Sequence, residues 1–558
     1  MGLLLVVAVA IGIGLRSWQY AASTSLWLDE IALVRGILDV DLFSLLTSPL
    51  PFNQVAPKGF LLVQKLTVMA LGPSDYALRL FPFACSLVAL VAFCRLSTRM
   101  LHGIGPLAAT SLFATAAPFV TFSGIVKQYS TDVCVAVLMW WLAYELASRP
   151  VTAKQAGWAA IIGAGLVWLS QPGVLMAAAL AIPLVLWLKA EPREASRWRR
   201  LALILVCWGA SALAVTNVGF RSMSPDTQEY MYRFWAAGFA PDSLSRALAI
   251  SWPWDRLKLL FGSGSGAQAG LAYPLSPLYA VLTATGCGVL LLQHRRIGVL
   301  LVAPVVVTLG AAVARQYPFS DRLISFLIPG FLLAIGAAIE AAHWAVSHFS
   351  RLLGGLVAAG LILPAVYPVA TAPPAYRFEP MKDVLSHVRA RWQPNDAVYV
   401  YYGAAPVVTF YATQYGLARG DYAIGGCHRG NGRRYLEELD TFRGRPRVWV
   451  VLTHALPRYR EREDLLAYLD KIGTRKDALV VESYAVGRTP HPAEAYLYDL
   501  SSASKLVSSS ASSFPLTSPS STDPRFICGE GPHGMIPSDF QCARSPNTGC
   551  TRVRSSSH

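Results

Sequence analysis

Leu3 to Leu15 have the sequence LLLVVAVAIGIGL, and similar apolar runs recur along the 558-residue chain. Apolar residues make up 54% of the sequence and charged residues only 15%, whereas an average soluble domain carries about 25% charged residues. The mean hydropathy is +0.42. This composition excludes a disordered chain, a coiled coil and an ordinary cytosolic enzyme, and it predicts a polytopic α-helical membrane protein.

The first run continues to Tyr20 and is interpreted as a membrane span. A secretory signal is disfavoured because no basic segment precedes the run and no clear small-residue cleavage site ends it. Further runs predict about eleven spans in all, at roughly 20 residues per crossing. They lie near 81–96, 104–122, 130–147, 156–170, 174–189, 201–217, 272–293, 297–314, 323–345 and 353–368. The run at 59–71 is too short to cross, so we expect an interfacial helix there.

The distribution of basic residues supports this topology. If 59–71 does not cross and the N-terminus is inside, nearly every basic cluster falls in an inside loop, as the positive-inside rule requires. These clusters are Arg95 with Arg99, Arg149 with Lys154, the run 189–200, Arg295 with Arg296, and Arg351. The net charge of +15 is therefore explained by topology, and no nucleic-acid partner is expected.

Three regions are then expected outside the membrane, namely a first loop at about 21–80, a loop at about 218–271, and residues 376–500. The last region has the composition of a soluble domain. Alternating β-branched and aromatic residues predict strands at 396–402 and 447–452, and helices are expected at 382–392 and 462–472. This order indicates a small extracytoplasmic α/β domain.

The chain thus divides into a membrane module at 1–375, the α/β domain at 376–500 and a tail at 501–558. The tail is rich in Ser and Pro and lacks apolar periodicity, so it is expected to be disordered.

An acidic pair, Asp29 and Glu30, stands just outside the first span, at the start of an amphipathic stretch. Such a pair at a membrane surface can act as a general base or bind a metal ion. The alternative is helix capping, in which both carboxylates complement the N-terminal dipole of the helix that follows. Trp27 is expected to anchor this segment at the headgroup level.

Lys58 and Arg79 stay on the outer face in this topology, against the usual charge bias. An anionic lipid phosphate is a natural partner for them. The alternative is a salt bridge to Asp75 or contact with an ordinary headgroup.

Two further groups lie at the outer ends of spans. Asp132, in the stretch KQYSTD, is a functional candidate because ionisable residues at membrane depth are costly, although it could also cap the helix that follows. Arg315, Tyr317 and Arg322 flank another helix start, an arrangement that suits a phosphate or pyrophosphate.

Together these segments resemble the GT-C membrane glycosyltransferases. The similarity is to the family 39 type, which includes protein O-mannosyltransferases, aminoarabinose transferases of lipid A and Rgt-type lipopolysaccharide glycosyltransferases. It covers roughly residues 1–345. The matching segments, in order, are Leu26–Glu30, Ala56–Gly59 with Ala77–Leu80, Lys127–Asp132 and Tyr317–Leu323. The sequence departs from the family pattern at Ala56-Pro57-Lys58, where His-Pro-Pro or Pro-Pro is usual.

The resemblance implies a GT-C fold in a bacterial inner membrane, with a polyprenyl-phosphate sugar as donor and a glycan, lipid or protein hydroxyl as acceptor. Asp29 would be the general base, Glu30 would support it, and Asp132 would be the second acidic residue. The donor phosphate would be held by Lys58, Arg79, Arg315, Tyr317 and Arg322. Some family members use a divalent metal ion and others do not; in the first case Asp29 and Asp132 would bind it here.

Two other function classes agree less well with the sequence. A transporter or flippase of lipid-linked sugars would need ionisable residues near the middle of the membrane, and the predicted spans contain almost none. A noncatalytic scaffold would leave the acidic pair and the outward basic residues without a role.

Overall fold

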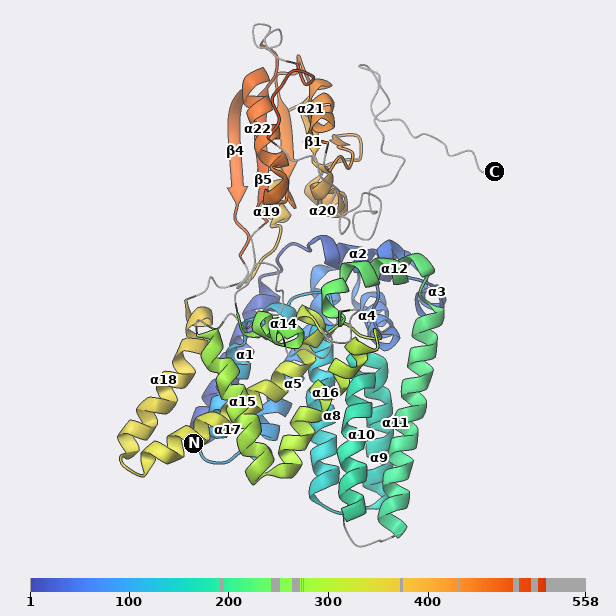
Figure 1. The fold of residues 1–558 in the computed structure, drawn as a ribbon. Coiled ribbons are helices and arrows are strands. Elements are labelled where there is room, and N and C mark those ends of the chain that lie inside the picture. The colour runs from blue at the N-terminus through green and yellow to red at the C-terminus, as the bar shows by residue number, and fades with distance from the viewer. Residues whose placement is uncertain are drawn as a thin grey trace.

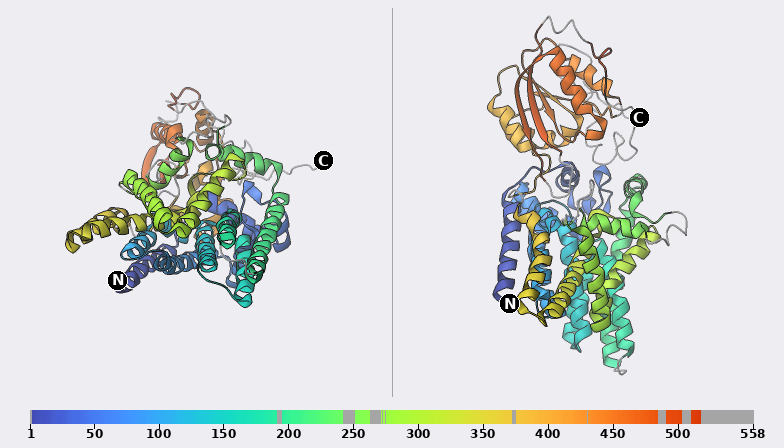
Figure 2. Two further views of the ribbon diagram at one scale, coloured as in Figure 1. Left: turned by 60° about the horizontal axis from the view of Figure 1, so that its bottom comes forward. Right: turned by 60° about the vertical axis from the view of Figure 1, so that its left-hand side comes forward.

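The computed structural model describes residues 2–190, 195–241, 251–262, 271, 273, 275–371, 375–429, 431–484, 491–502 and 510–517. A bundle of long helices forms the body of the protein, and a small sheet domain stands at one end of it (Figure 1 and Figure 2). Short helices from the first loop lie between the two.

Each of the predicted apolar runs forms a helix. These helices are α1 (Gly2–Ala21), α5 (Asp75–Met100), α6 (Gly105–Thr115) with α7 (Ala117–Ser123), α8 (Tyr129–Ser148), α9 (Ala153–Leu169), α10 (Pro172–Ala190), α11 (Ala195–Arg221), α15 (Ser276–Gln293), α16 (Arg295–Val313), α17 (Ile328–Ser347) and α18 (Arg351–Ala370). Among the described residues, eight helices are long and apolar enough to cross a membrane, and the bent pair α6–α7 would add a ninth. The predicted spans at 156–170 and 174–189 fall on α9, which has 17 residues, and on α10, whose apolar part is described as far as Trp187, and neither is among these eight. The predicted fold class, a polytopic helical membrane protein, is confirmed.

The remaining helices of the membrane module gather at the end that carries the sheet domain (Figure 1). They are α2 (Leu28–Asp39), α3 (Leu42–Thr47), η1 (Pro51–Asn53), α4 (Lys58–Leu71), α12 (Pro225–Phe234), η2 (Ala236–Gly238), α14 (Ser251–Phe261) and η3 (Asp321–Leu327). The helix α4 has 14 residues, which is too short to cross about 30 Å of hydrocarbon. This length agrees with the prediction that 59–71 does not span.

A buried arginine, overlooked in the sequence, holds the bend between α6 and α7. These helices meet at 49°, and Pro118 has no N–H to give to the carbonyl of Ala114. Arg16 of α1 is fully buried and donates to the carbonyls of Ala114 (2.8 Å) and Phe113 (3.1 Å). It also donates to Ser86 Oγ at 2.8 Å. The guanidinium thus replaces the helix hydrogen bonds lost at the break.

The C-terminal domain contains a five-stranded sheet in the order β2-β1-β3-β5-β4. The strands β2, β1 and β3 are parallel, with Val398 opposite Trp449, and β5 is antiparallel to both β3 and β4. Its elements are α19 (Met381–Ala390), β1 (Ala397–Val400), η4 (Tyr402–Ala404), α20 (Ala405–Tyr411), η5 (Ala412–Tyr415), β2 (Tyr422–Ile424), α21 (Gly432–Asp440), β3 (Val448–Leu452), η6 (Pro457–Tyr459), α22 (Glu461–Ile472), β4 (Thr474–Val481) and β5 (Ala493–Asp499). The predicted strands and helices coincide with β1, β3, α19 and α22, which confirms an α/β domain.

One stretch of the tail packs on this domain. Phe514 is buried, Arg433 donates to the carbonyl of Ser512 at 2.5 Å, and the backbone N–H of Thr517 donates to Asp464 at 2.9 Å. Residues 510–517 therefore differ from the disorder expected after Ser501. The other tail residues beyond 502 lie outside the described part of the chain.

The first loop and the C-terminal domain share one hydrophobic core. It contains Ile31, Val34 and Ile37 of α2 together with Val384 of α19 and Val408 of α20. The apolar face of α2 is therefore covered by protein. Trp27, expected as an interface anchor, is only 8% exposed, and its ring lies 5.7 Å from that of Phe378.

Candidate active site

A cavity of about 400 Å³ opens at the end of the bundle beneath α2. Its wall is formed by the start of α2, the segments before α4 and α8, the ends of α10 and α11 that lie toward the sheet domain, α12, and the segment before η3. We call it the α2 cavity. Five of the predicted site residues line it, namely Asp29, Lys58, Arg315, Tyr317 and Arg322. Glu30, Arg79 and Asp132 are not part of its wall.

Asp29 and Arg322 form an ion pair in this cavity. Nη2 of Arg322 lies 3.0 Å from Oδ2 of Asp29, and the side chains are 8% and 18% exposed. The guanidinium carbon also lies 5.6 Å from the ring centre of Tyr129 and 5.3 Å from that of Trp235. Stacking and the ion pair fix the guanidinium plane. Arg322, which the sequence analysis placed with the donor phosphate, therefore orients the predicted base Asp29.

Two lysines bring positive charge to the same cavity. Nζ of Lys58 donates to the carbonyls of Leu45 (3.0 Å) and Ser48 (3.2 Å), and burial lowers the pKa of this lysine. Lys127 lines the cavity too and donates to Gln54 Oε1 at 2.7 Å. Burial lowers the pKa of Lys127 to about 8, against the nearby Asp29 carboxylate, which raises it.

Sequence reasoning gave Lys127 no role, although it begins the KQYSTD stretch. It lies between the end of α7 and the start of α8, so no helical periodicity shows which way its side chain faces. Its position in the sequence could have indicated a role. Lys127 stands two residues before Tyr129, the first residue of α8, and Tyr129 also lines the cavity.

Arg315 and Tyr317 lie on the segment that leads into η3. Arg315 is exposed and adopts a left-handed backbone conformation with φ of 58°, and its carbonyl accepts from the hydroxyl of Tyr232 at 3.0 Å. The hydroxyl of Tyr317 donates to the carbonyl of Leu323 at 2.8 Å. Both residues line the cavity, whose volume of about 400 Å³ is within the usual range of small-molecule sites.

Glu30 and Arg79 form a buried structural pair behind the cavity wall. Nη2 of Arg79 lies 3.7 Å from Oε1 of Glu30, and both side chains are 2% exposed. Glu30 accepts from the backbone N–H groups of Val126 (2.7 Å) and Trp27 (3.3 Å). Burial raises the pKa of Glu30, and Arg79 lowers it. The capping alternative thus describes Glu30, and Arg79 is not placed to bind a donor phosphate.

We expect Glu30→Gln to destabilise the protein by about 1 to 3 kcal/mol, because a neutral amide leaves Arg79 without its buried counter-charge. The measurement is the midpoint of thermal unfolding in detergent. Asp39→Asn is the matched control, since Asp39 is on the same helix and 58% exposed. An equal midpoint for Glu30→Gln and wild type would contradict a structural pair.

Asp132 lies in the first turn of α8 and is 5% exposed. The helix begins at Tyr129 after Gln128, so Asp132 is inside the helix and does not cap it. Among the described residues, no three His, Cys, Asp or Glu side chains gather as metal ligands. Asp29 faces Arg322 while Asp132 lies outside the cavity wall. Of the two residues that the resemblance implied as metal ligands, only Asp29 therefore lines the cavity.

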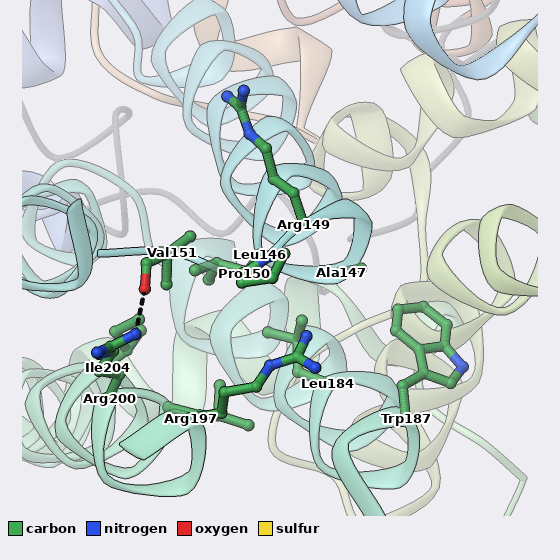
Figure 3. Close-up of a pocket in the computed structure, with 11 residues that line it drawn as sticks. Leu146, Ala147, Arg149, Pro150, Val151, Leu184, Trp187, Arg197, Arg200 and Ile204 are labelled. Carbon is green, nitrogen blue, oxygen red and sulfur yellow. Dashed lines mark hydrogen bonds between the residues drawn. The ribbon is translucent and has the colours of Figure 1, made fainter. Parts of the chain in front are cut away.

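A second, smaller cavity of about 50 Å³ lies at the other end of α8, α10 and α11. Figure 3 shows Arg149, Arg197 and Arg200 around it, with Arg200 donating to the carbonyl of Val151 at 2.8 Å. No carboxylate lines it. Its arginines belong to the basic clusters that the sequence places inside, and it contains no predicted site residue.

No family model and no curated protein matches the chain. Solved structures do align with it. Apo ArnT from Cupriavidus metallidurans aligns at 12% identity and a TM-score of 0.47 over 90% of this chain and 98% of that chain. AglB, an oligosaccharyltransferase from Archaeoglobus fulgidus in complex with an inhibitory peptide and a dolichol-phosphate, aligns at 12% and 0.48 over 92% and 75%. ArnT bound to undecaprenyl phosphate aligns at 12% and 0.45 over 90% and 98%. These likenesses are too distant to assign an activity, so the function is argued from the chain's own residues.

Proposed function

We propose that the protein is a membrane glycosyltransferase that moves a sugar from a polyprenyl-phosphate donor to an acceptor hydroxyl. The observation that carries this proposal is the composition of the α2 cavity. One carboxylate, Asp29, faces several cationic side chains at the end of the membrane helices. Displacement of a lipid phosphate from an anomeric carbon needs that combination, a base for the acceptor and positive charge for the leaving group.

In the proposed reaction, the acceptor oxygen bonds to the anomeric carbon while the bond from that carbon to the phosphate oxygen breaks. The hydroxyl proton passes to Asp29, and polyprenyl phosphate leaves with the bonding electrons. Arg322 keeps the Asp29 carboxylate aimed into the cavity. Glu30 supports it indirectly, because Glu30 closes the first turn of the same helix through the N–H of Trp27.

The leaving phosphate is assigned to the basic residues on the cavity wall. Lys58, Lys127 and Arg315 line the cavity from three different segments. Cationic groups from separate elements can surround a phosphate and stabilise the charge that develops on it.

An apolar wall of the cavity suits the prenyl chain. Val174 and Leu175 of α10 and Val215 and Phe220 of α11 line the cavity. Phe220 is 53% exposed, and only 17% of the residues in the apolar stretch of α11 are buried within the protein. Since α11 thus faces the surrounding lipid, a polyprenyl chain can leave the cavity along it without crossing a polar surface.

The proposal places the protein in the bacterial inner membrane with the α2 cavity and the C-terminal domain outside the cytoplasm. The positive-inside distribution of the basic loops supports this orientation. The acceptor could be a glycan, a lipid or a protein, and its binding is assigned to the region between the cavity and the C-terminal domain.

The test begins with mass spectrometry of the polyprenyl-phosphate lipids in cells that lack the protein. These cells are complemented with wild type, Asp29→Asn or the control Asp39→Asn. One sugar-linked lipid should accumulate in the null and in Asp29→Asn and clear with the other two. The lipid fraction that accumulates is then given to purified protein in detergent, together with a cell-envelope extract that supplies the acceptor hydroxyl. Release of free polyprenyl phosphate marks transfer, whereas a transporter would leave the lipid intact; an unchanged pool would contradict the proposal.

Donor binding should weaken as the pH rises through about 8. Lys127 is protonated below its pKa of about 8 and neutral above it, and the donor phosphodiester keeps its charge across this range. Above the pKa, the dissociation constant should rise and then level off, because Lys58 and Arg315 remain to hold the phosphate. The measurement is donor binding between pH 7 and 9.5. In Lys127→Gln this pH dependence should disappear, and in the control Lys65→Gln, outside the cavity, it should remain.

A further inference from the structure

In the first turn of the helix that carries Asp29, Glu30 accepts from the N–H of Trp27, but the N–H of Leu28 has to find its partner outside the helix. The N-cap residue Trp27 makes no side-chain cap hydrogen bond, and the first N–H groups of any helix lack partners within it. The N–H of Leu28, the first helical residue, donates to Oε2 of Glu379 at 3.1 Å. This carboxylate comes from the segment that leads into α19, so the C-terminal domain completes the first turn of α2.

Glu379 is itself fixed on the side away from α2. It is 1% exposed, and Nδ1 of His454 lies 2.7 Å from its Oε1. Its backbone N–H donates to Ser483 Oγ at 3.0 Å. Glu379 and His454 also both have positive φ, 45° and 54°, a conformation that non-glycine residues adopt at an energetic cost. Two strained residues in one buried contact indicate that their placement matters.

Neighbouring contacts hold the segment before α2 in the same way. The N–H of Leu26 donates to the hydroxyl of Tyr411 at 3.0 Å, and that hydroxyl donates to Asp75 at 2.9 Å. The backbone N–H of Lys382 donates to Ser25 Oγ at 3.0 Å. The C-terminal domain therefore sets the backbone of residues 25–28 from several sides.

We infer that the C-terminal domain positions the base of the active site, with Glu379 as the positioning residue. Asp29 directly follows Leu28, so a shift of the first helical turn moves its carboxylate. A carboxylate at a helix N-terminus is favourable for the helix dipole, and a misplacement of about 1 Å can cost roughly 100-fold in rate. This inference rests on the proposed function, since it concerns the residue assigned as base.

The experiment compares Glu379→Ala, Glu379→Gln and His454→Ala with the control Asp383→Asn. Asp383 lies on α19 and is 56% exposed. Backbone hydrogen exchange over residues 24–31 reports the contact without any need for activity. Turnover and donor dissociation constant are measured on the same full-length proteins. Glutamine has nearly the same shape as glutamate and keeps an oxygen that can accept the N–H of Leu28. Glu379→Gln therefore distinguishes loss of this contact from general misfolding of the alanine variant.

In Glu379→Ala, exchange over residues 24–31 should become faster and turnover should fall about 10- to 100-fold. The donor dissociation constant should stay within about 2-fold of wild type, because the phosphate ligands do not contact Glu379. Glu379→Gln should fall between wild type and alanine. The double variant with His454→Ala should lose less than the sum of the two single variants, since both act through one contact.

Two results would overturn the inference. Unchanged exchange over 24–31 in Glu379→Ala would show that the domain does not hold α2, and faster exchange with unchanged turnover would show that the contact does not serve catalysis. Failure of the proposed function has a different signature. Wild type would then release no polyprenyl phosphate, whereas the exchange data would still decide whether Glu379 fixes the helix.

Discussion

Asp29→Asn should lower turnover by about 10²- to 10⁴-fold, the usual contribution of a general base. Asparagine has the same shape and can still accept a hydrogen bond from Arg322, which lies 3.0 Å from the carboxylate in wild type. It has no lone pair basic enough to take the acceptor proton. The measurement is the rate of polyprenyl-phosphate release, with turnover and Michaelis constant determined separately. The loss should fall almost wholly on turnover.

The control for this variant is Asp39→Asn at the exposed end of the same helix. It should retain wild-type turnover, and both variants should unfold at nearly the wild-type temperature. A fully active Asp29→Asn protein would remove Asp29 from the mechanism. A protein that loses activity together with its thermal transition would point to a structural role instead.

Arg322→Ala should lower turnover by about 10²- to 10³-fold, comparable to the loss of one oriented charge-stabilising donor in other active sites. Its removal leaves Asp29, which is 18% exposed, without the guanidinium that orients it. Arg322→Lys should recover only part of this loss, because an ammonium group cannot reproduce the planar stacking on Trp235. Arg351→Ala, an exposed arginine at the start of α18, is the control.

A double variant separates the two roles that Arg322 could have. If Arg322 acts only by orienting Asp29, then Arg322→Ala should cost almost nothing in an Asp29→Asn background. If it also holds the donor phosphate, the double variant should additionally bind the donor more weakly. Wild-type turnover in Arg322→Ala would refute both roles.

The helices and the soluble domain were predictable because their signals are local. Long apolar runs located the helices, and the alternation at 396–402 located β1. The boundaries of α9 and α10 show the limit of this signal, since mean hydropathy does not fix where a helix begins or ends. The hairpin of β4 and β5 was missed, because β4 alternates as an edge strand with charged residues.

The site was only partly predictable, because side-chain direction depends on packing between distant segments. The sequence places Glu30 at the start of an amphipathic stretch, but it does not show that the loop at Val126 covers this carboxylate. Arg79 is buried as well, because its guanidinium pairs with the covered Glu30 carboxylate. Lys127 shows the opposite situation. The periodicity of its neighbours does not predict that it faces the cavity of Asp29, and the turn before α8 places it there.

The core shared between α2, α4 and the sheet domain has a consequence for the order of synthesis. Apart from Val126, the first half of that core ends at Leu78, and its partner residues begin at Met381. At about 5 to 20 residues per second, roughly 300 intervening residues take about 15 to 60 s to translate. During that interval the loop that carries Asp29 emerges with its apolar face uncovered, so the proposed activity is expected only after the sheet domain has folded onto it.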